Sequence, residues 1–220
     1  MNIAIAINKA HFPVTVLGPG RRLGIWVQGC SIHCRGCVSQ DTWAPDRQRE
    51  MPVAQLLAWC RQVTQDGFDG VTISGGEPFD QPRALAALLD GLTHWRKSAG
   101  SDFDILCYSG YPLATLRKRH ARLLARLDAV IAEPYVESLP PTHLWRGSAN
   151  QTLQALSPRG LERYAPYAKA GAEDVAKRIQ MSVDGQRVWY IGIPGRGDMA
   201  ALEAQCRERG VAFEQVSWRQ

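Results

Sequence analysis

Residues 24–37 read GIWVQGCSIHCRGC, a short apolar run followed by three closely spaced cysteines. The run at residues 24–28 has the length and apolar character of a buried strand, so we expect the cysteines to begin where that strand ends. Open α/β sheets and (β/α) barrels place their active sites at the carboxyl ends of their strands. The stretch therefore predicts an α/β protein whose chemistry lies at that edge of the sheet.

Strand-like and helix-like stretches alternate after the cysteines. Further buried strands are expected at residues 70–74, 104–108 and 129–132. Amphipathic helices are expected at residues 53–65, 82–95 and 113–127. Such alternation is typical of parallel βαβ units. We therefore expect an α/β fold built around parallel strands.

The pattern changes after about residue 160. A stretch rich in Pro, Gly and Tyr at residues 158–171 is expected to be a linker or a packed loop. The elements expected beyond it are a hairpin of residues 178–183 and 186–193 with an Asp-Gly turn, a helix over 199–209 and a last strand over 211–216. We therefore expect two parts, a core of residues 1–160 and a small α+β C-terminal extension of residues 161–220.

Composition limits the class of protein. The chain has 220 residues, of which 45% are hydrophobic and 21% charged, which is typical of a globular protein and excludes a disordered or fibrous one. No run approaches the roughly 18–20 uncharged apolar residues of a membrane span, and the first ten residues do not resemble a signal peptide. We expect a cytoplasmic protein without a membrane partner. The net charge of +5 suits an acidic partner.

Cys30, Cys34 and Cys37 have the spacing C-x3-C-x2-C. Six cysteines are too few for a disulfide scaffold in a chain of this length, and clustered thiolates suit zinc or an iron–sulfur cluster. A structural zinc site closes with four ligands, and a four-iron cluster normally takes four thiolates. Three cysteines predict a [4Fe-4S] cluster in which one iron stays open to a substrate or cofactor. A zinc site completed by another side chain is the alternative.

With this cysteine spacing the chain resembles the radical S-adenosylmethionine (SAM) enzymes, and more closely the activating enzymes of anaerobic ribonucleoside-triphosphate reductase, which are glycyl-radical activases. The matching segments follow the family's order within residues 1–160. They are residues 29–37, 41–43, 74–78, 108–111, 128–136 and 146–151. The resemblance implies a partial (β/α) barrel of radical SAM type. The chain departs from the activases at Val38-Ser39, where they usually have His-Asn, and in its last 60 residues.

The resemblance also implies the site residues. The metal ligands are Cys30, Cys34 and Cys37. The cofactor-binding residues are Gly36, Val38, Ser74, Gly75, Gly76, Glu77, Ser109, Arg146, Ser148 and Asn150. The paired glycines allow close approach of the backbone to a ligand, and Glu77 offers a carboxylate to the amine of SAM. No side chain is expected to be catalytic itself, because the [4Fe-4S] cluster and SAM carry the chemistry.

The implied reaction is reductive cleavage of SAM to a 5′-deoxyadenosyl radical, which installs a glycyl radical on a partner such as anaerobic ribonucleotide reductase. An electron donor such as flavodoxin is the second implied partner. Two alternatives stay open. The first is a radical SAM enzyme that acts on another peptide, a nucleoside or a small molecule, and the second is a non-enzymatic zinc-binding module.

The expected helix at residues 113–127 is strongly basic. Its cationic residues include Arg117, Lys118, Arg119, Arg122 and Arg126. A solvated helix face is the usual explanation, and a docking surface for an acidic protein or nucleic acid is the other. The chain has no zinc finger, RNP motif or Walker loop, so we do not expect a nucleic-acid partner.

Overall fold

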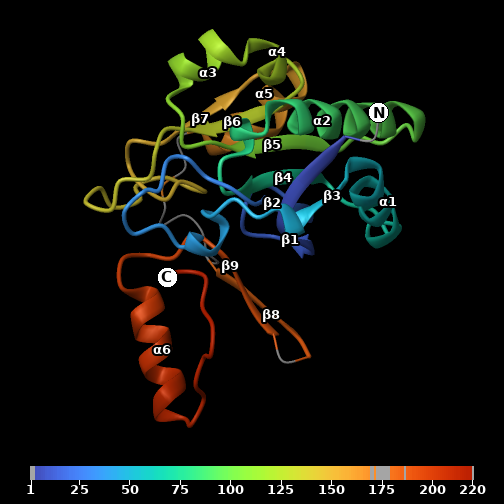
Figure 1. Ribbon diagram of the computed structural model, residues 1–220. Helices are drawn as coiled ribbons and strands as arrows, with labels where there is room; N and C mark the ends of the chain where they lie inside the picture. Colours follow the sequence, from blue (N-terminus) through green and yellow to red (C-terminus); the bar gives the residue numbers. More distant parts are fainter. Residues whose placement is uncertain (1–2, 169–170, 172–178, 186, 220) are drawn as a thin grey trace.

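The computed structural model describes residues 3–168, 171, 179–185 and 187–219 (Figure 1). The strands are β1 (Ala4–Val14), β2 (Arg22–Val27), β3 (Glu50–Pro52), β4 (Gly70–Gly75), β5 (Asp104–Tyr108), β6 (Ala129–Ala132), β7 (Thr152–Ala155), β8 (Ile179–Asp184) and β9 (Arg187–Gly192). The α-helices are α1 (Val53–Val63), α2 (Pro82–Ser98), α3 (Leu113–Arg119), α4 (Ala121–Leu124), α5 (Pro158–Tyr164) and α6 (Asp198–Glu208). The 3₁₀ helices are η1 (Gln40–Thr42), η2 (Arg47–Arg49), η3 (Pro78–Asp80) and η4 (Ala165–Tyr167).

The central sheet has the strand order β3-β1-β2-β4-β5-β6-β7. Its inner strands β2, β4, β5 and β6 are parallel, and helices connect each of them to the next. β1, β3 and β7 pair antiparallel with their neighbours toward the two edges. The parallel core with its helical connections confirms the expected α/β fold of partial-barrel type.

The two faces of the sheet are covered differently. Helices α1 and α2 pack on one face and form the main core with it (Figure 1). The buried leucines of α2 are Leu85, Leu88, Leu89 and Leu92. Each leucine withdrawn from water contributes about 2 kcal/mol to folding. On the opposite face, Trp145, Tyr164 of α5 and Ile191 of β9 pack against side chains of the sheet.

The single helix expected at residues 113–127 is wrong, because α3 and α4 are separated at His120. This residue leaves the helical region, with φ −130° and ψ 27°. Its amide donates to the carbonyl of Leu116 at 2.8 Å, and its carbonyl accepts from the amide of Leu124 at 3.0 Å. Its ring lies 5.2 Å from the ring of buried Phe79. Tertiary packing overrides helix propensity here.

The stretch at residues 158–171 begins with α5, so it is a packed segment where it can be described. The Ser157 hydroxyl caps the helix by accepting from the amide of Gly160 at 2.9 Å. A Cβ on Gly160 would lie 1.7 Å from the carbonyl oxygen of Asp128, so glycine permits this close approach. Residues 169–170 lie outside the described residues.

The expected hairpin is confirmed as β8 and β9, which pair antiparallel. Asp184 pairs with Arg187, and Gly185 has φ +58°, the left-handed conformation that an Asp-Gly hairpin turn needs. Residues 178 and 186, which belong to the expected strands, lie outside the described part of the chain.

The rest of the C-terminal part agrees only partly with expectation. α6 confirms the helix expected at residues 199–209. The strand expected at residues 211–216 is wrong, because this described segment contains no strand. Instead the ring of Phe213 lies 6.2 Å from that of Tyr190, so ring packing takes the place of strand pairing. The division at residue 160 falls inside α5 and stays a prediction.

The strands β1, β3 and β7 have no counterpart in the expectations. They lie toward the edges of the sheet, and most of their residues are only half-buried. Edge strands therefore show a weak hydrophobic pattern. Within the residues that the structure describes, no helix has the length and apolar character to cross a membrane.

Candidate functional site

The three cysteines lie on residues 29–43, which we call the cysteine loop. It leaves the carboxyl end of β2 and returns to the same point. The amide of Gly29 donates to the carbonyl of Thr42 at 2.7 Å, and the amide of Cys30 donates to that of Trp43 at 3.0 Å. Since every residue of β2 is buried, the base of the loop is anchored in the centre of the sheet.

The thiols of Cys30, Cys34 and Cys37 are half-buried and unpaired. Burial raises the pKa of all three, and the thiols of Cys37 and Cys30 raise the pKa of Cys34 further. Backbone amides oppose this rise. The amide of Ser39 lies 3.4 Å from the sulfur of Cys37, and that of Tyr135 faces Cys34. Such N–H groups stabilise a thiolate, which is the form that binds metal.

This donor set fits a four-iron cluster better than a single metal ion. Within the described residues, no three Cys, His, Asp or Glu side chains converge as a mononuclear site requires. Zinc needs four ligands at about 2.0–2.3 Å, whereas a cluster spreads its thiolates over separate irons. Cys60 and Cys107 are fully buried in the main core, and Cys206 lies on α6. The loop thus offers three thiolates, and the geometry does not favour the zinc alternative.

Asp80 of η3 holds the first part of the cysteine loop. Its carboxylate accepts from the amide of Ser31 at 2.8 Å and from the hydroxyl of Ser31 at 3.1 Å. It also accepts from the hydroxyl of Tyr111 at 2.8 Å. Asp80 follows β4 and Tyr111 follows β5, so the ends of two further strands fix this part of the loop.

Gly75 and Gly76 bring the end of β4 against the base of the loop. The amide of Gly76 donates to the carbonyl of Val27, and the amide of Glu77 donates to that of Gly29, both at 2.9 Å. A Cβ on Gly76 would lie 2.0 Å from the Gly29 oxygen. Gly75 has φ +104°, and a Cβ there would lie 2.5 Å from the amide nitrogen of Val27. Both positions therefore require glycine.

Glu77 ends in a buried carboxylate. It accepts from the amide of Phe79 at 3.0 Å, from the hydroxyl of Ser109 at 2.9 Å and from the amide of Gly110 at 2.8 Å. None of the described residues places a cationic group beside it, and burial raises the pKa of Glu77 to about 7. A buried carboxylate with only neutral donors is suited to receive a cationic group such as an ammonium.

Residues 133–137, which follow β6, lie next to the cysteine loop. The carboxylate of Glu137 pairs with the guanidinium of Arg35 at 3.3 Å. A Cβ on Gly36 would lie 2.9 Å from the Glu137 side chain, and Gly36 has φ +76°. Glycine at this position therefore lets the loop pass beneath residues 133–137.

Ser148 and Asn150 hold residues 133–137 from the other side. The hydroxyl of Ser148 accepts from the amide of Val136 at 3.1 Å, and the side-chain nitrogen of Asn150 donates to the carbonyl of Pro134 at 2.8 Å. The buried Oδ1 of Asn150 has no hydrogen-bond partner among the described residues. Buried acceptors are normally hydrogen-bonded, so this oxygen is a candidate for a contact with a ligand.

The other expected site residues lie in different settings. Arg146 donates to the carbonyls of Leu144 at 3.4 Å and Ala168 at 3.2 Å, rather than to the cysteine loop. Ser74 is half-buried within β4, and Val38 is exposed just beyond the third cysteine. The structure thus gathers the cysteines, the glycine pair, Glu77 and Ser109 at one end of the sheet, while the Arg146 side chain bonds to the main chain at Leu144 and Ala168.

Sequence reasoning missed three residues that contribute to this region. Asp80 lies three residues after Glu77, and this proximity to a motif is a signal that could have identified it. Ser217 and Trp218 reach residues 38–43, which we call the return arm of the cysteine loop. No local signal marks them, because a segment near the chain end shows nothing of its distant partner.

Comparison with known proteins identifies the family. The sequence pattern of the 4Fe-4S single cluster domain matches residues 16–154. The anaerobic ribonucleoside-triphosphate reductase-activating protein of Vibrio cholerae is 33% identical over 148 residues, covering 65% of this chain and 94% of that protein. Its counterpart in enterobacteria phage T4 is 30% identical over 139 residues, covering 63% and 86%, and that of Escherichia coli is 27% identical over 154 residues, covering 66% and 96%.

Among solved structures, QueE from Escherichia coli aligns with a TM-score of 0.44 and 18% identity, covering 73% of this chain and 67% of that one. The relatives confirm the resemblance that the cysteine spacing and the Gly-Gly-Glu-Pro segment indicate. The chain belongs to the 4Fe-4S single cluster domain family and to the family of the anaerobic ribonucleoside-triphosphate reductase-activating proteins.

Proposed function

We propose that the protein is a radical SAM enzyme that cleaves SAM reductively at a [4Fe-4S] cluster and installs a glycyl radical on an anaerobic ribonucleotide reductase. One observation carries this proposal. The cysteine loop carries three half-buried thiols, and its base is bonded through Gly29 to the turn at residues 75–77, whose carboxylate lacks a cationic partner in the described part of the chain. The names of the relatives support the partner.

Cys30, Cys34 and Cys37 would hold the cluster through one iron each and leave the fourth iron to SAM. When bound, the cluster and SAM supply the one-electron chemistry that yields methionine and a 5′-deoxyadenosyl radical. The chain's own contribution is geometric. Its strand ends fix the cysteine loop, and its buried groups orient the ligand.

Glu77 is the proposed partner of the SAM ammonium group, with Ser109 orienting its carboxylate through the 2.9 Å hydrogen bond. The ammonium would supply the positive charge that the protein does not place there. Asn150 is the best supported of the three expected contacts in residues 146–151, because its buried Oδ1 has no partner among the described residues. Arg146 and Ser148 already bond to main-chain groups, so their support is weaker.

The remaining proposed SAM contacts come from the loop and the strand ends. Gly75 and Gly76 present backbone at the base of the cysteine loop. Gly36 and Val38 flank the third cysteine, and Ser74 precedes the glycine pair. These positions lie within the cysteine loop or at the end of β4 beside its base, where SAM would be bound.

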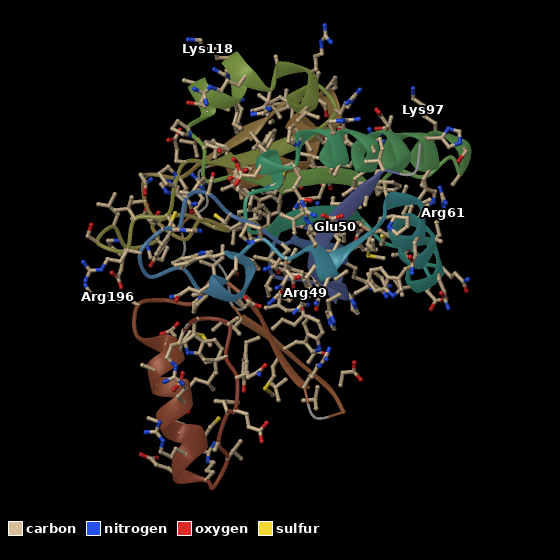
Figure 2. The ribbon with its side chains drawn as sticks, in the orientation of Figure 1. Arg49, Glu50, Arg61, Lys97, Lys118 and Arg196 are labelled. Carbon is tan, nitrogen blue, oxygen red and sulfur yellow. The ribbon has the colours of Figure 1, made fainter. Side chains whose placement is uncertain are left out.

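An acidic one-electron donor such as flavodoxin is the proposed reductant. α3 and α4 expose Arg117, Lys118, Arg119 and Arg122, and Figure 2 shows Lys118 projecting away from the fold. α3 begins just after Tyr111, which bonds to the residue that holds the cysteine loop. We expect SAM cleavage driven by the protein donor to fall as salt is raised, because salt screens surface charges. Cleavage driven by dithionite should keep its rate, and equal sensitivity would contradict this docking face.

The direct test is anaerobic reconstitution of the chain with iron and sulfide. The wild type should become brown with iron–sulfur absorption, and Cys34→Ala should lose the cluster and all SAM cleavage. Cys206→Ala is the matched control, because this cysteine lies on α6 outside the loop. This variant should keep both the cluster and SAM cleavage. A reductase incubated with the wild type, SAM and dithionite should then show the glycyl doublet in electron paramagnetic resonance.

Two results would contradict the proposal at different levels. A colourless protein that retains zinc would remove the radical chemistry altogether. SAM cleavage without a glycyl signal would keep that chemistry and favour another peptide, a nucleoside or a small molecule as the target. The residues beyond 154, which the family pattern does not cover, are the observation that supports this second candidate.

A further inference from the structure

Residues 217 and 218 lie against the return arm of the cysteine loop, and Figure 1 shows the red C-terminal segment near that loop. The hydroxyl of Ser217 donates to the carbonyl of Val38 at 3.0 Å. The amide of Asp41 donates to the carbonyl of Ser217 at 3.3 Å, and the side chain of Gln40 donates to that of Trp218 at 3.0 Å. Three hydrogen bonds thus join the end of the chain to the segment that follows the third cysteine.

Trp218 is itself held firmly. Its indole N–H donates to the carboxylate of Glu203 on α6 at 2.5 Å, and Arg219 pairs with the same carboxylate at 3.0 Å. Its ring stands edge-on to Phe213 at 6.3 Å and to Tyr190 of β9 at 6.4 Å. The chain end is therefore fixed to both α6 and the hairpin by ring packing and charge-assisted hydrogen bonds.

The hairpin in turn is fixed to the central sheet. Ile191 of β9 is buried in one cluster with Trp26 of β2. Gln180 of β8 donates to the carbonyl of Pro13 at 2.6 Å and accepts from the amide of Thr15 at 2.9 Å. A continuous set of contacts therefore runs from the sheet through the hairpin and the aromatic rings to the cysteine loop.

Other contacts reach the return arm at its far end, residues 41–43, where the amides of Gly29 and Cys30 donate to the carbonyls of Thr42 and Trp43. Lys9 of β1 pairs with the carboxylate of Asp41 at 2.7 Å, and Gln28 donates to the carbonyl of Asp41 at 3.1 Å. The side-chain nitrogen of Asn8 donates to the same carbonyl at 3.3 Å, so these three side chains all meet Asp41. Within the described residues, Ser217 supplies the side-chain hydrogen bond that reaches Val38, just after Cys37, from outside the loop.

We propose that the C-terminal extension is a brace for the cysteine loop, in which Ser217 and Trp218 are positioning residues for the Cys37 thiol. The role toward Cys37 rests on the proposed cluster-binding function. The amide of Ser39, which lies 3.4 Å from the Cys37 sulfur, belongs to the braced arm, so an arm that opens would lose this interaction. The family pattern ends at residue 154, so the brace lies outside the part that the pattern covers.

Amide hydrogen exchange in the metal-free chain tests the brace without any cluster. In Ser217→Ala and Trp218→Ala we expect peptides of the return arm to exchange about fivefold to tenfold faster. Ser217→Ala removes the hydrogen bond to Val38, and Trp218→Ala removes the ring and indole contacts that fix this segment. Ser217→Thr keeps the hydroxyl and should restore protection. Met181→Ala is the matched control, since this side chain is 64% exposed on β8 and should change nothing.

Two outcomes of the exchange experiment would overturn the brace. One is unchanged exchange in both variants. The other is equal acceleration throughout the cysteine loop, Ser31 included, which would mean general loosening. Ser217→Ala removes a single oxygen atom, so it keeps the test valid if Trp218→Ala does not fold.

A second readout in the cluster-loaded protein tests the role toward Cys37. The iron–sulfur absorption of Ser217→Ala should bleach in air about fivefold faster than that of the wild type or of Ser217→Thr, because an open arm exposes the cluster. An unchanged bleaching rate would overturn the positioning role. If the wild type binds no cluster, the proposed function fails, while the exchange result still decides whether the brace exists.

Discussion

Asp104 and Glu77 are both buried carboxylates of the central sheet, but they lie at opposite ends of it and have different partners. Asp104 begins β5, and its oxygens accept from the guanidinium of Arg22 at 2.6 and 3.0 Å and from the hydroxyl of Tyr164 at 2.5 Å. Glu77 follows the end of β4 and accepts only from amides and a hydroxyl within the described residues.

The difference separates a structural end of the sheet from a functional one. Arg22 compensates the charge of Asp104 and also donates to the Thr72 hydroxyl at 2.6 Å and the Val71 carbonyl at 2.9 Å, so this end needs no ligand. At the other end, Glu77 has no cationic partner among the described residues, and burial raises its pKa to about 7. The functional site is therefore expected at the end of the sheet that holds Glu77, where a cationic ligand would neutralise the buried carboxylate.

The change with the greatest effect removes the buried ion pair between Asp104 and Arg22 at the structural end of the sheet. Asp104→Asn should lower the free energy of unfolding by about 3–5 kcal/mol, because Arg22 would stay buried without a counter-charge. Urea unfolding measures this loss. Asp102→Asn is the matched control, since its side chain is 75% exposed on the surface, and it should cost less than about 1 kcal/mol. Equal losses in the two variants would contradict the structural role of the buried pair.

The second effect is a pH dependence that arises from Glu77. Its pKa in the folded chain, about 7, lies above its ordinary value of 4.5, so the folded state holds this proton more tightly than the unfolded state does. The stability contributed by the protonated group is fully present below pH 4.5 and is lost as the pH rises through 7. Relative to Glu77→Gln, the metal-free wild type should lose about 3 kcal/mol across that range. A pH-independent difference between the two would show that Glu77 does not titrate this way.

The change with the least effect concerns SAM binding by Glu77 at the functional end of the sheet. Glu77→Gln keeps the shape of the side chain but removes its charge, so SAM affinity should fall about tenfold to a hundredfold. Calorimetry on the cluster-loaded protein measures the affinity, and iron content should stay at the wild-type level. Asp104→Asn, measured at a temperature where it is folded, should bind SAM normally. Equal loss of iron and of SAM binding in Glu77→Gln would mean that this residue is structural.

Local patterns were sufficient for the parallel core. The expected strands at residues 104–108 and 129–132 agree with β5 and β6 residue for residue, because buried strands are short, continuous apolar runs. Local patterns failed where distant partners decide, as at His120, whose ring packs on Phe79, and at residues 211–216, where ring contacts replace a strand. These failures share one cause, since helix and strand propensities are weak against tertiary packing.

The parallel α/β core, the spacing of the three thiols and the family can all be derived from the sequence, because apolar periodicity and cysteine spacing are properties of neighbouring residues. The folded structure alone places Ser109 and Gly110, 32 and 33 residues away, against the Glu77 carboxylate. It also decided that Trp218 reaches Gln40 across 178 residues. Such contacts depend on how separate elements pack, and no local pattern of residues encodes the partner that folding brings beside them.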